Sequence, residues 1–436
     1  METEIRQLLR ERAGDVGLDD VMPRSTLERA RRRRALTGVA TAGTLAAVII
    51  GAVFGVGAIT GSRAIEYVDQ PMEPKRVTSV SLADIPYGLT SGFGSIWATG
   101  GSDITRIDPR TGKATARIEL TGGPRRVGDT TERDSFTVLA ATLTAGEDAM
   151  WVLGQRAGSA FFATAAPLTA SPSGQGQTSA TFSMEAHAIG PQSQGPPVGS
   201  PTPEPFLMPP GEWSLLRIDP RDNSVRETDR IEVGRPPQFM TAGEGSVWLA
   251  TEDGALAGSV WRFSGKTGKL EERFQVRGIP MGVAAQGGSV YVAVAPALQG
   301  KLVLRIDPKA NRIVDEIAVP GAAWARAITA ADDDVWVAAG RGEAEGGSYL
   351  VARIDARSGR LLGTIDVPSN LAELAAGGGF LWGVPQEEGE SVLRIVGNVL
   401  AGRLSLQRLP VSALVEDGKL WLGGVPAELN VSRYEF

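Results

Sequence analysis

A set of aromatic, amide, thioether and charged side chains recurs at related positions of this sequence. The set comprises Tyr87, Gln238, Met281, Trp324, Arg326 and Glu373. Four of them lie ten residues before the aromatic residue of an apolar, strand-like segment, whereas Trp324 lies two residues earlier and Glu373 one residue later in their segments. Such a mixture around one opening is typical of a ligand site. We therefore expect these residues to lie at the rim of a central channel and to bind a ligand there, and the alternative is an ordinary solvated surface.

The usual signals of catalysis are weak in this chain. The sequence has no cysteine and one histidine, His187, which lies in a low-complexity segment. A serine–histidine–aspartate triad therefore lacks a well-placed histidine, and the acidic residues show no metal-ligand spacing. We assign no catalytic residue and no metal ligand, and we expect no cofactor. The net charge of −6 makes nucleic acid an unexpected partner.

The elements that must position these side chains form a repeat. Seven apolar segments carry one aromatic residue each, namely Trp97, Trp151, Trp248, Tyr291, Trp336, Trp382 and Trp421. A second segment follows each of them and is centred on an arginine, namely Arg106, Arg217, Arg262, Arg305, Arg353, Arg394 and Arg433. Because every copy carries both residues, we expect them to be structural, with the arginines bonding between copies to aspartates or backbone carbonyls. Aspartates that begin the following turns, as at residues 108–112, are expected to cap those turns rather than to bind a metal.

The spacing of the repeat predicts a β-propeller. Copies that recur about every 40–50 residues with several strands per unit are typical of propeller blades. The seventh copy stops inside its third strand, and residues 76–82 resemble the outer strand of the other copies. We therefore expect residues 76–82 to pair with residues 430–436 and to close a seven-bladed ring.

The repeat also resembles that of YncE-like and virginiamycin B lyase-like propellers, in which a Gly-x-Val-Trp strand precedes an Arg-Ile-Asp-Pro strand. The resemblance covers residues 75–436, with the two motifs present at 245–248 and 305–308. It implies the fold more than an activity, because that family mixes enzymes with binding proteins. Its lyases depend on a histidine and a divalent metal, and His187 matches no family position. The order of basic tail, single anchor and outer propeller resembles that of actinobacterial membrane proteins.

An uncharged segment near the N-terminus predicts attachment to a membrane. Residues 1–34 contain nine arginines and seven acidic residues, whereas residues 35–60 carry no charge. As a helix, residues 35–60 would span about 39 Å, more than the roughly 30 Å of a hydrocarbon core. We expect an uncleaved, single-pass transmembrane helix that follows a cytoplasmic basic tail at 1–34 and precedes a linker at 61–74 and an outer propeller at 75–436. The alternatives are a cleaved signal peptide and a buried core helix.

Two insertions interrupt the repeat in connections that open on one face of the ring. One lies around residues 122–135, and the other occupies residues 155–212 in the second copy. The second is rich in serine, proline, glycine and glutamine, so we expect it to be disordered. Acidic loop residues are also expected on this face.

The fold class predicted is therefore all-β, a seven-bladed β-propeller preceded by a transmembrane helix and a short cytoplasmic tail. The leading hypothesis is a non-enzymatic, membrane-anchored module that binds a protein, peptide or envelope ligand on its loop face. An alternative is a lyase- or hydrolase-like enzyme that uses rim carboxylates, with or without a divalent metal. A third hypothesis is a scaffold that acts through the cytoplasmic tail and the ring together. The ligand and the oligomeric state stay open.

Overall fold

The computed structural model describes residues 72, 75–127, 130–156, 211–233, 237, 239–254, 256–298, 301–342, 348–425, 427 and 429–436. Within these ranges the secondary structure consists of β-strands arranged in seven sheets. No helix in the described part of the chain is long and apolar enough to cross a membrane. Residues 35–60 lie outside the described residues, so the transmembrane helix stays a prediction.

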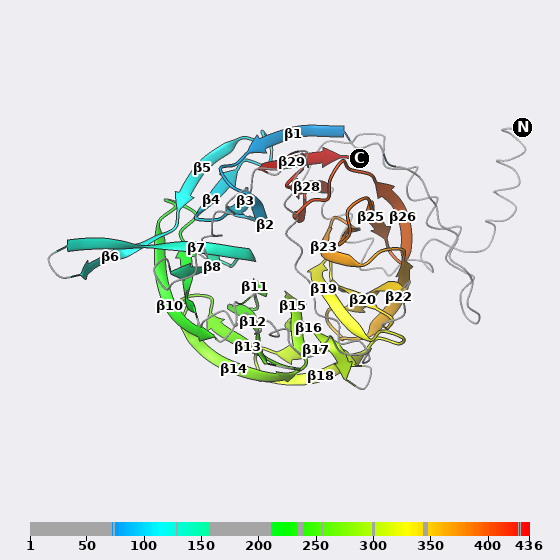
Figure 1. Cartoon of the computed structure of the whole chain (residues 1–436). Helices are drawn as coiled ribbons and strands as arrows, with labels where there is room; N and C mark the ends of the chain where they lie inside the picture. Colours follow the sequence, from blue (N-terminus) through cyan, green and yellow to red (C-terminus); the bar gives the residue numbers. More distant parts are fainter. Residues whose placement is uncertain are drawn as a thin grey trace, which may run out of the picture. The chain divides into compact units, whose positions relative to one another are not determined.

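Six of the seven blades are built from consecutive strands (Figure 1). Blade one contains β2 (Pro86–Gly92), β3 (Ser95–Gly100), β4 (Asp103–Ile107) and β5 (Ala114–Glu119). Blade two contains β6 (Thr121–Val127), β7 (Thr130–Ala145), β8 (Met150–Arg156), β9 (Gly211–Ile218) and β10 (Val225–Val233). Blade three contains β11 (Phe239–Gly243), β12 (Ser246–Gly254), β13 (Ala257–Ser264) and β14 (Leu270–Arg277).

The second half of the ring repeats this pattern. Blade four contains β15 (Ile279–Gln286), β16 (Ser289–Leu298), β17 (Lys301–Asp307) and β18 (Arg312–Ala318). Blade five contains β19 (Trp324–Ala331), β20 (Asp334–Gly340), β21 (Tyr349–Asp355) and β22 (Leu361–Val367). Blade six contains β23 (Leu371–Gly377), β24 (Phe380–Pro385), β25 (Val392–Val396) and β26 (Val399–Leu404). Blade seven contains β27 (Ser412–Glu416), β28 (Lys419–Gly423), β29 (Asn430–Glu435) and β1 (Lys75–Ser81).

The innermost strands of the blades surround the centre of the ring (Figure 1), and residues of six of them line a cavity there. Contacts run from β2 to β7, β11, β15, β19, β23 and β27 in turn, and β27 contacts β2 again. The ring is therefore closed. Apart from β7, which pairs with β6 as well as β8, each innermost strand pairs with one neighbour only. Its other edge presents backbone N–H and C=O groups without a partner strand.

The two ends of the described ring meet in one blade. Strand β1 pairs antiparallel with β29, from Lys75 opposite Glu435 to Ser81 opposite Asn430. This confirms the predicted closure of the seventh blade. Because the N-terminal strand fills the outer position, the last sheet is completed and its β29 edge is covered.

Four of the repeated arginines join neighbouring blades, as predicted, whereas Arg217 and Arg353 donate to aspartates of their own blades. Arg262 lies over the ring of Trp248 at 5.5 Å, and its Nε donates to the Ser246 hydroxyl at 2.9 Å. Its Nη1 donates to the backbone carbonyl of Pro308, in the turn of the next blade, at 2.7 Å. Equivalent donations to turn carbonyls of the next blade come from Arg106, Arg305 and Arg433. The arginine therefore fixes both its own blade and the angle to the next.

The aspartates that begin the outer turns cap those turns. The Asp108 carboxylate accepts the backbone N–H groups of Arg110 and Thr111, and the hydrogen bond from Arg110 is the main cause that lowers its pKa. Gly112 closes the turn with a φ of 65°, a left-handed conformation that glycine adopts without strain. The predicted role of these aspartates in turn chemistry is confirmed.

The core lies between the blades and not inside one sheet. Trp248, Val260 and Phe274 of blade three pack in one cluster with Val290 and Leu304 of blade four. Both faces of each sheet are thus buried, which explains why the strands read as nearly continuous apolar runs rather than as alternating ones.

The two insertions both belong to blade two. Residues 122–135 fall in β6 and the first part of β7, which pair antiparallel and extend outward from the ring (Figure 1). Around the second insertion the strands run further than predicted, because β8 ends at Arg156 and β9 begins at Gly211. Residues 157–210 lie outside the described residues, so the predicted disorder there stays a prediction.

Candidate functional site

The predicted ligand residues fall where the innermost strands are irregular. In four blades the pairing of the innermost strand shifts by one residue, so that one residue is left out of the ladder. These residues are Tyr87, Met281, Arg326 and Ala372. They are also the residues ten positions before the strand aromatic, so this sequence position is a β-bulge. A bulge turns a side chain away from the regular strand face, which frees this position for a role outside the core.

Trp324 lies at the start of β19 and rests on a glycine. It pairs with Gly340 of β20, and its ring meets Tyr349 edge-on, with centroids 6.2 Å apart and planes at 73°. A Cβ atom on Gly340 would lie 2.8 Å from Nε1 of Trp324 and closer still to two carbons of the ring. Only a residue without a side chain at 340 therefore lets the indole adopt this position.

Arg326 has no charge or carbonyl partner among the described residues. Arg394 has none either, but its guanidinium lies over the rings of Phe380 and Trp382. Arg326 occupies the bulge of β19 and is half-buried. Within the described part of the chain it forms no hydrogen bond and no ion pair, and burial lowers the pKa of its guanidinium. A guanidinium withdrawn from water without a partner is costly. An anionic or carbonyl-bearing ligand at this position would supply the missing partner.

Glu373 lies deeper than the rim position that we predicted for it. It lines a cavity of about 350 Å³ in the channel, formed by the innermost strands of six blades. Its Oε1 accepts the backbone N–H of Ala413, on the neighbouring strand β27, at 3.0 Å. The side chain keeps some contact with the channel but is enclosed by the ring, and this burial raises the pKa of its carboxyl to about 8, against the opposing effect of the Ala413 hydrogen bond.

The structure brings together only part of the predicted set. Met281, Trp324, Arg326 and Glu373 lie on β15, β19 and β23, which are consecutive around the ring. Met281 is partly buried against the core between blades four and five, so packing accounts for much of its surface. Tyr87 is 43% exposed and lies on β2, whose neighbours are β7 and β27, away from the other three strands. Gln238 lies outside the described residues.

A group of hydroxyl side chains in the channel was missed by the sequence analysis. The cavity wall includes Thr90, Thr144, Thr241 and Thr329. Each pairs directly with the repeated tryptophan of its blade and lies seven residues before it. The repeat itself could have indicated these residues, because a threonine stands seven residues before the aromatic in four of the seven copies.

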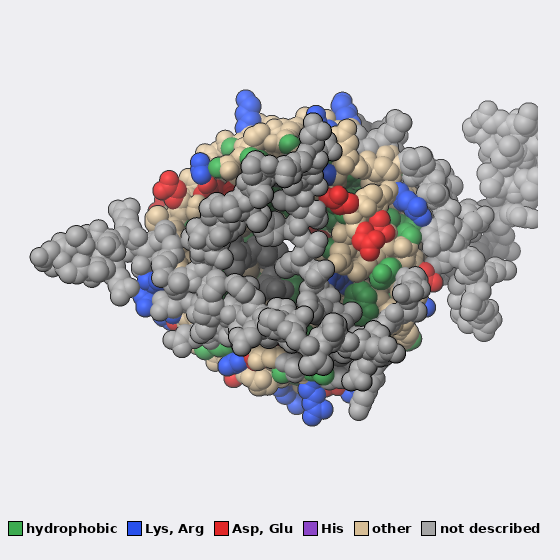
Figure 2. All heavy atoms as spheres, in the orientation of Figure 1, with side chains coloured by type: hydrophobic (Ala, Val, Ile, Leu, Met, Phe, Trp, Pro, Cys, Tyr) green, Lys and Arg blue, Asp and Glu red, His purple; other side chains and the backbone are tan. Residues whose placement is uncertain are grey.

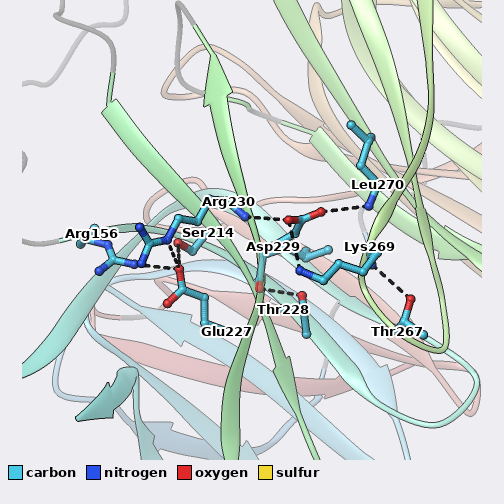
Figure 3. Close-up of polar contacts among 10 residues, drawn as sticks. Arg156, Ser214, Glu227, Thr228, Asp229, Arg230, Thr267, Lys269 and Leu270 are labelled. Atoms are coloured by element: carbon cyan, nitrogen blue, oxygen red, sulfur yellow. Dashed lines mark hydrogen bonds and ion pairs between the residues drawn. The ribbon is translucent and has the colours of Figure 1, made fainter. Parts of the chain in front are cut away.

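Several charged groups of blade two are bonded within that blade or to the next one. Arg156 is buried, and its Nη2 donates to Oε1 of Glu227 at 2.7 Å, an oxygen that also accepts from Ser214 and Arg230 (Figure 3). Burial opposes ionisation of Glu227, but these three partners outweigh it and lower its pKa. In the same region Asp229 accepts from the backbone of Leu270 on the next blade. This network joins strands of blade two to one another and to blade three.

Some acidic groups do remain exposed on the face of the ring in view. Figure 2 shows acidic side chains over the blade of β23–β26, and Glu387 and Glu388 are exposed in the loop between β24 and β25. Among the described residues, no group of three or more histidine, aspartate or glutamate side chains could hold a metal ion. The described residues of this face therefore offer separate carboxylates.

Comparison with known proteins supports the architecture. The WD40 domain of Pan2 from Neurospora crassa is similar in structure, with a TM-score of 0.50 over 85% of this chain and 97% of that one. The chain is a seven-bladed β-propeller. At 8% sequence identity the likeness shows the fold alone. No family model matches the sequence, and no curated protein matches it.

Proposed function

We propose that this propeller is a non-enzymatic binding module that takes a protein, peptide or envelope ligand on the face where its innermost strands begin. In this proposal residues 35–60 anchor it in the cell membrane, with residues 1–34 in the cytoplasm and the ring outside. The repeat motifs at 245–248 and 305–308 support a YncE-like relationship.

The observation that carries the proposal is the unpartnered Arg326 beside Trp324. The repeated arginines that bond across blades donate their N–H groups to turn carbonyls. Arg326 instead lies at a bulge, keeps its charge while half-buried, and lies two residues from an aromatic side chain. Neither residue is needed by the repeat, since the other blades carry different residues at both positions. Arginine and tryptophan are also the residues most enriched in binding hot spots.

The proposal is tested by replacing Trp324 and Arg326 and measuring the amount of protein or peptide that the chain captures. The full-length chain with Trp324→Ala and Arg326→Ala is compared with the unchanged chain for capture from an envelope fraction, read by quantitative mass spectrometry. A matched control carries Leu270→Ala and Arg277→Ala on the exposed outer strand β14. We expect the rim pair to weaken binding by on the order of 2 kcal/mol or more, about 30-fold in Kd. Equal capture by both double variants would overturn the proposal.

One observation favours a second function. A carboxyl whose pKa is raised to about 8 is protonated at neutral pH and could act as a general acid, as Glu373 would. Glu373 is, however, the one charged residue among the described residues that line its cavity, so we expect a second acid–base group to come from the substrate. Turnover of a metabolite panel that is lost in Glu373→Gln would establish this enzymatic alternative.

A further inference from the structure

The channel contains a polar cavity that is separate from the proposed ligand site at Trp324 and Arg326, which we call the rim site. Its volume of about 350 Å³ falls in the range of small-molecule sites. Hydroxyl groups from four different blades line it, at Thr90, Thr144, Thr241 and Thr329. The innermost strands add backbone groups along edges that pair with no other strand. The wall is therefore rich in oxygen atoms that can accept hydrogen bonds.

One charged side chain lies in this wall, and it is acidic. Glu373 is the single ionisable residue among the described residues that line the cavity, and no aromatic residue lines it. One carboxyl oxygen accepts the N–H of Ala413. The described residues supply no further partner, so the carboxyl retains capacity to accept from a ligand.

The charges on neighbouring strands do not neutralise this group. Strand β23 packs against β19, β20, β24 and β27. Their charged residues are Arg326 on β19, Asp334 on β20, which accepts two hydrogen bonds from Arg353, and Glu416 on β27. None of them is a cause of the raised pKa of Glu373, which follows from burial. A cation placed in the cavity would therefore be the first opposite charge that this carboxyl meets.

We propose that the channel cavity binds the ammonium group of a small primary amine, with Glu373 as its counter-ion. An ammonium has three N–H donors, which match one carboxylate and the surrounding hydroxyl and carbonyl oxygens. A divalent metal prefers several carboxylates, and the cavity has one. A quaternary ammonium is recognised by aromatic side chains, which the cavity wall lacks.

Binding of such a cation is linked to the release of a proton. At pH 7 the Glu373 carboxyl is protonated in the empty cavity, and the bound ammonium favours the carboxylate. The complex therefore forms as the carboxyl loses its proton to the buffer, while the amine stays protonated. Affinity should increase about tenfold per pH unit below pH 8 and level off above it, as long as the amine keeps its proton.

The test is calorimetric titration of the full-length chain with n-propylammonium chloride at pH 6, 7 and 8, in buffers that differ in heat of ionisation. We expect saturable binding, release of close to one proton at pH 7, and affinity that rises with pH. Titration with 1-propanol, which has the same carbon chain without the charge, should give no binding. Tetramethylammonium and calcium chloride should not compete.

Variants assign the effect to one carboxyl. Glu373→Gln keeps an acceptor for Ala413 and should abolish binding, whereas Glu416→Gln, outside the cavity on the next innermost strand, should leave it unchanged. In the unchanged chain, a carboxyl-carbon NMR titration should show the Glu373 pKa falling when propylammonium is added. Absence of binding, binding that survives Glu373→Gln, binding without proton release, or competition by calcium would each overturn the proposal. The cavity is separate from the rim site, so the Trp324→Ala and Arg326→Ala variant should still bind propylammonium.

Discussion

Arg262 and Arg326 show how the same side chain serves two purposes in one ring. Arg262 stacks on Trp248 and donates to Ser246 and to the next blade, so its charge is distributed among fixed partners. Arg326 has no such partner among the described residues and lies at a bulge. At the scale of the residue, arginines shared by the repeat, such as Arg262, stabilise the ring, whereas Arg326 is the candidate contact for a ligand.

Glu373 should make stability depend on pH in a defined direction. Its pKa rises from about 4.5 in the unfolded chain to about 8 in the ring because of burial. Between these values the folded state holds the extra proton, so the free energy of unfolding falls as pH rises, by roughly 1.4 kcal/mol per pH unit at most, and is flat below and above the window. Urea unfolding of the unchanged chain and of Glu373→Gln at pH 4 to 9 measures the difference. The stability gap between the two should widen in favour of glutamine from pH 4.5 to 8, and a constant gap would contradict the raised pKa.

Substitutions at Gly340 and Trp324 should be energetically coupled, because the indole ring of Trp324 occupies the space that a side chain at position 340 would take. Gly340→Ala should lower the free energy of unfolding by about 1–3 kcal/mol, because the new Cβ collides with the indole. In the Trp324→Ala background the same change should cost much less. A double-mutant cycle in urea measures this coupling directly. Additive effects would show that the indole does not rest on Gly340.

At the scale of the element, the link between blades is an arginine reaching a turn. Arg262→Lys loses the planar fork that bonds Ser246 and Pro308 together, and a lysine cannot replace both contacts. We expect a loss of about 1–3 kcal/mol in the free energy of unfolding. Arg277→Lys, an exposed position on outer strand β14, is the matched control and should change stability by less than about 0.5 kcal/mol. If Arg262→Lys and Arg277→Lys both change the free energy of unfolding by similarly small amounts, Arg262 does not stabilise the contact between blades.

The innermost strands also show how far the sequence could predict the site. Counting ten residues back from the aromatic reaches a β-bulge in four blades, which the sequence analysis did not predict. It could not place Glu373, since one residue of difference across a bulge moves a side chain from the rim to the cavity wall. Nor could it show that Met281 packs against the core cluster between blades four and five, because that packing depends on the angle between two sheets. The seven blades and their closure were predictable because they depend on repeated residues alone.

At the scale of the whole molecule, closure by β1 should decide whether the ring stays monomeric. Deleting residues 1–83 removes β1 and exposes the edge of β29, which pairs with it along its length. Deleting residues 1–71 keeps β1 and serves as the control. We expect the longer deletion to aggregate and to melt several degrees lower, as measured by light scattering and thermal unfolding, because an unpaired edge recruits other chains. Identical behaviour of both deletions would contradict closure by this strand.

The binding function itself is tested most directly by a photo-reactive amino acid placed at Trp324 in the full-length chain in living cells. We expect a discrete cross-linked product on irradiation, because this position lies at the proposed contact with the ligand. Adding Arg326→Ala should remove that product, and the same photo-reactive residue at Leu270 on the outer strand should give none. Absence of a product at 324, or the same product from 324 and 270, would contradict a binding site on this face of the ring.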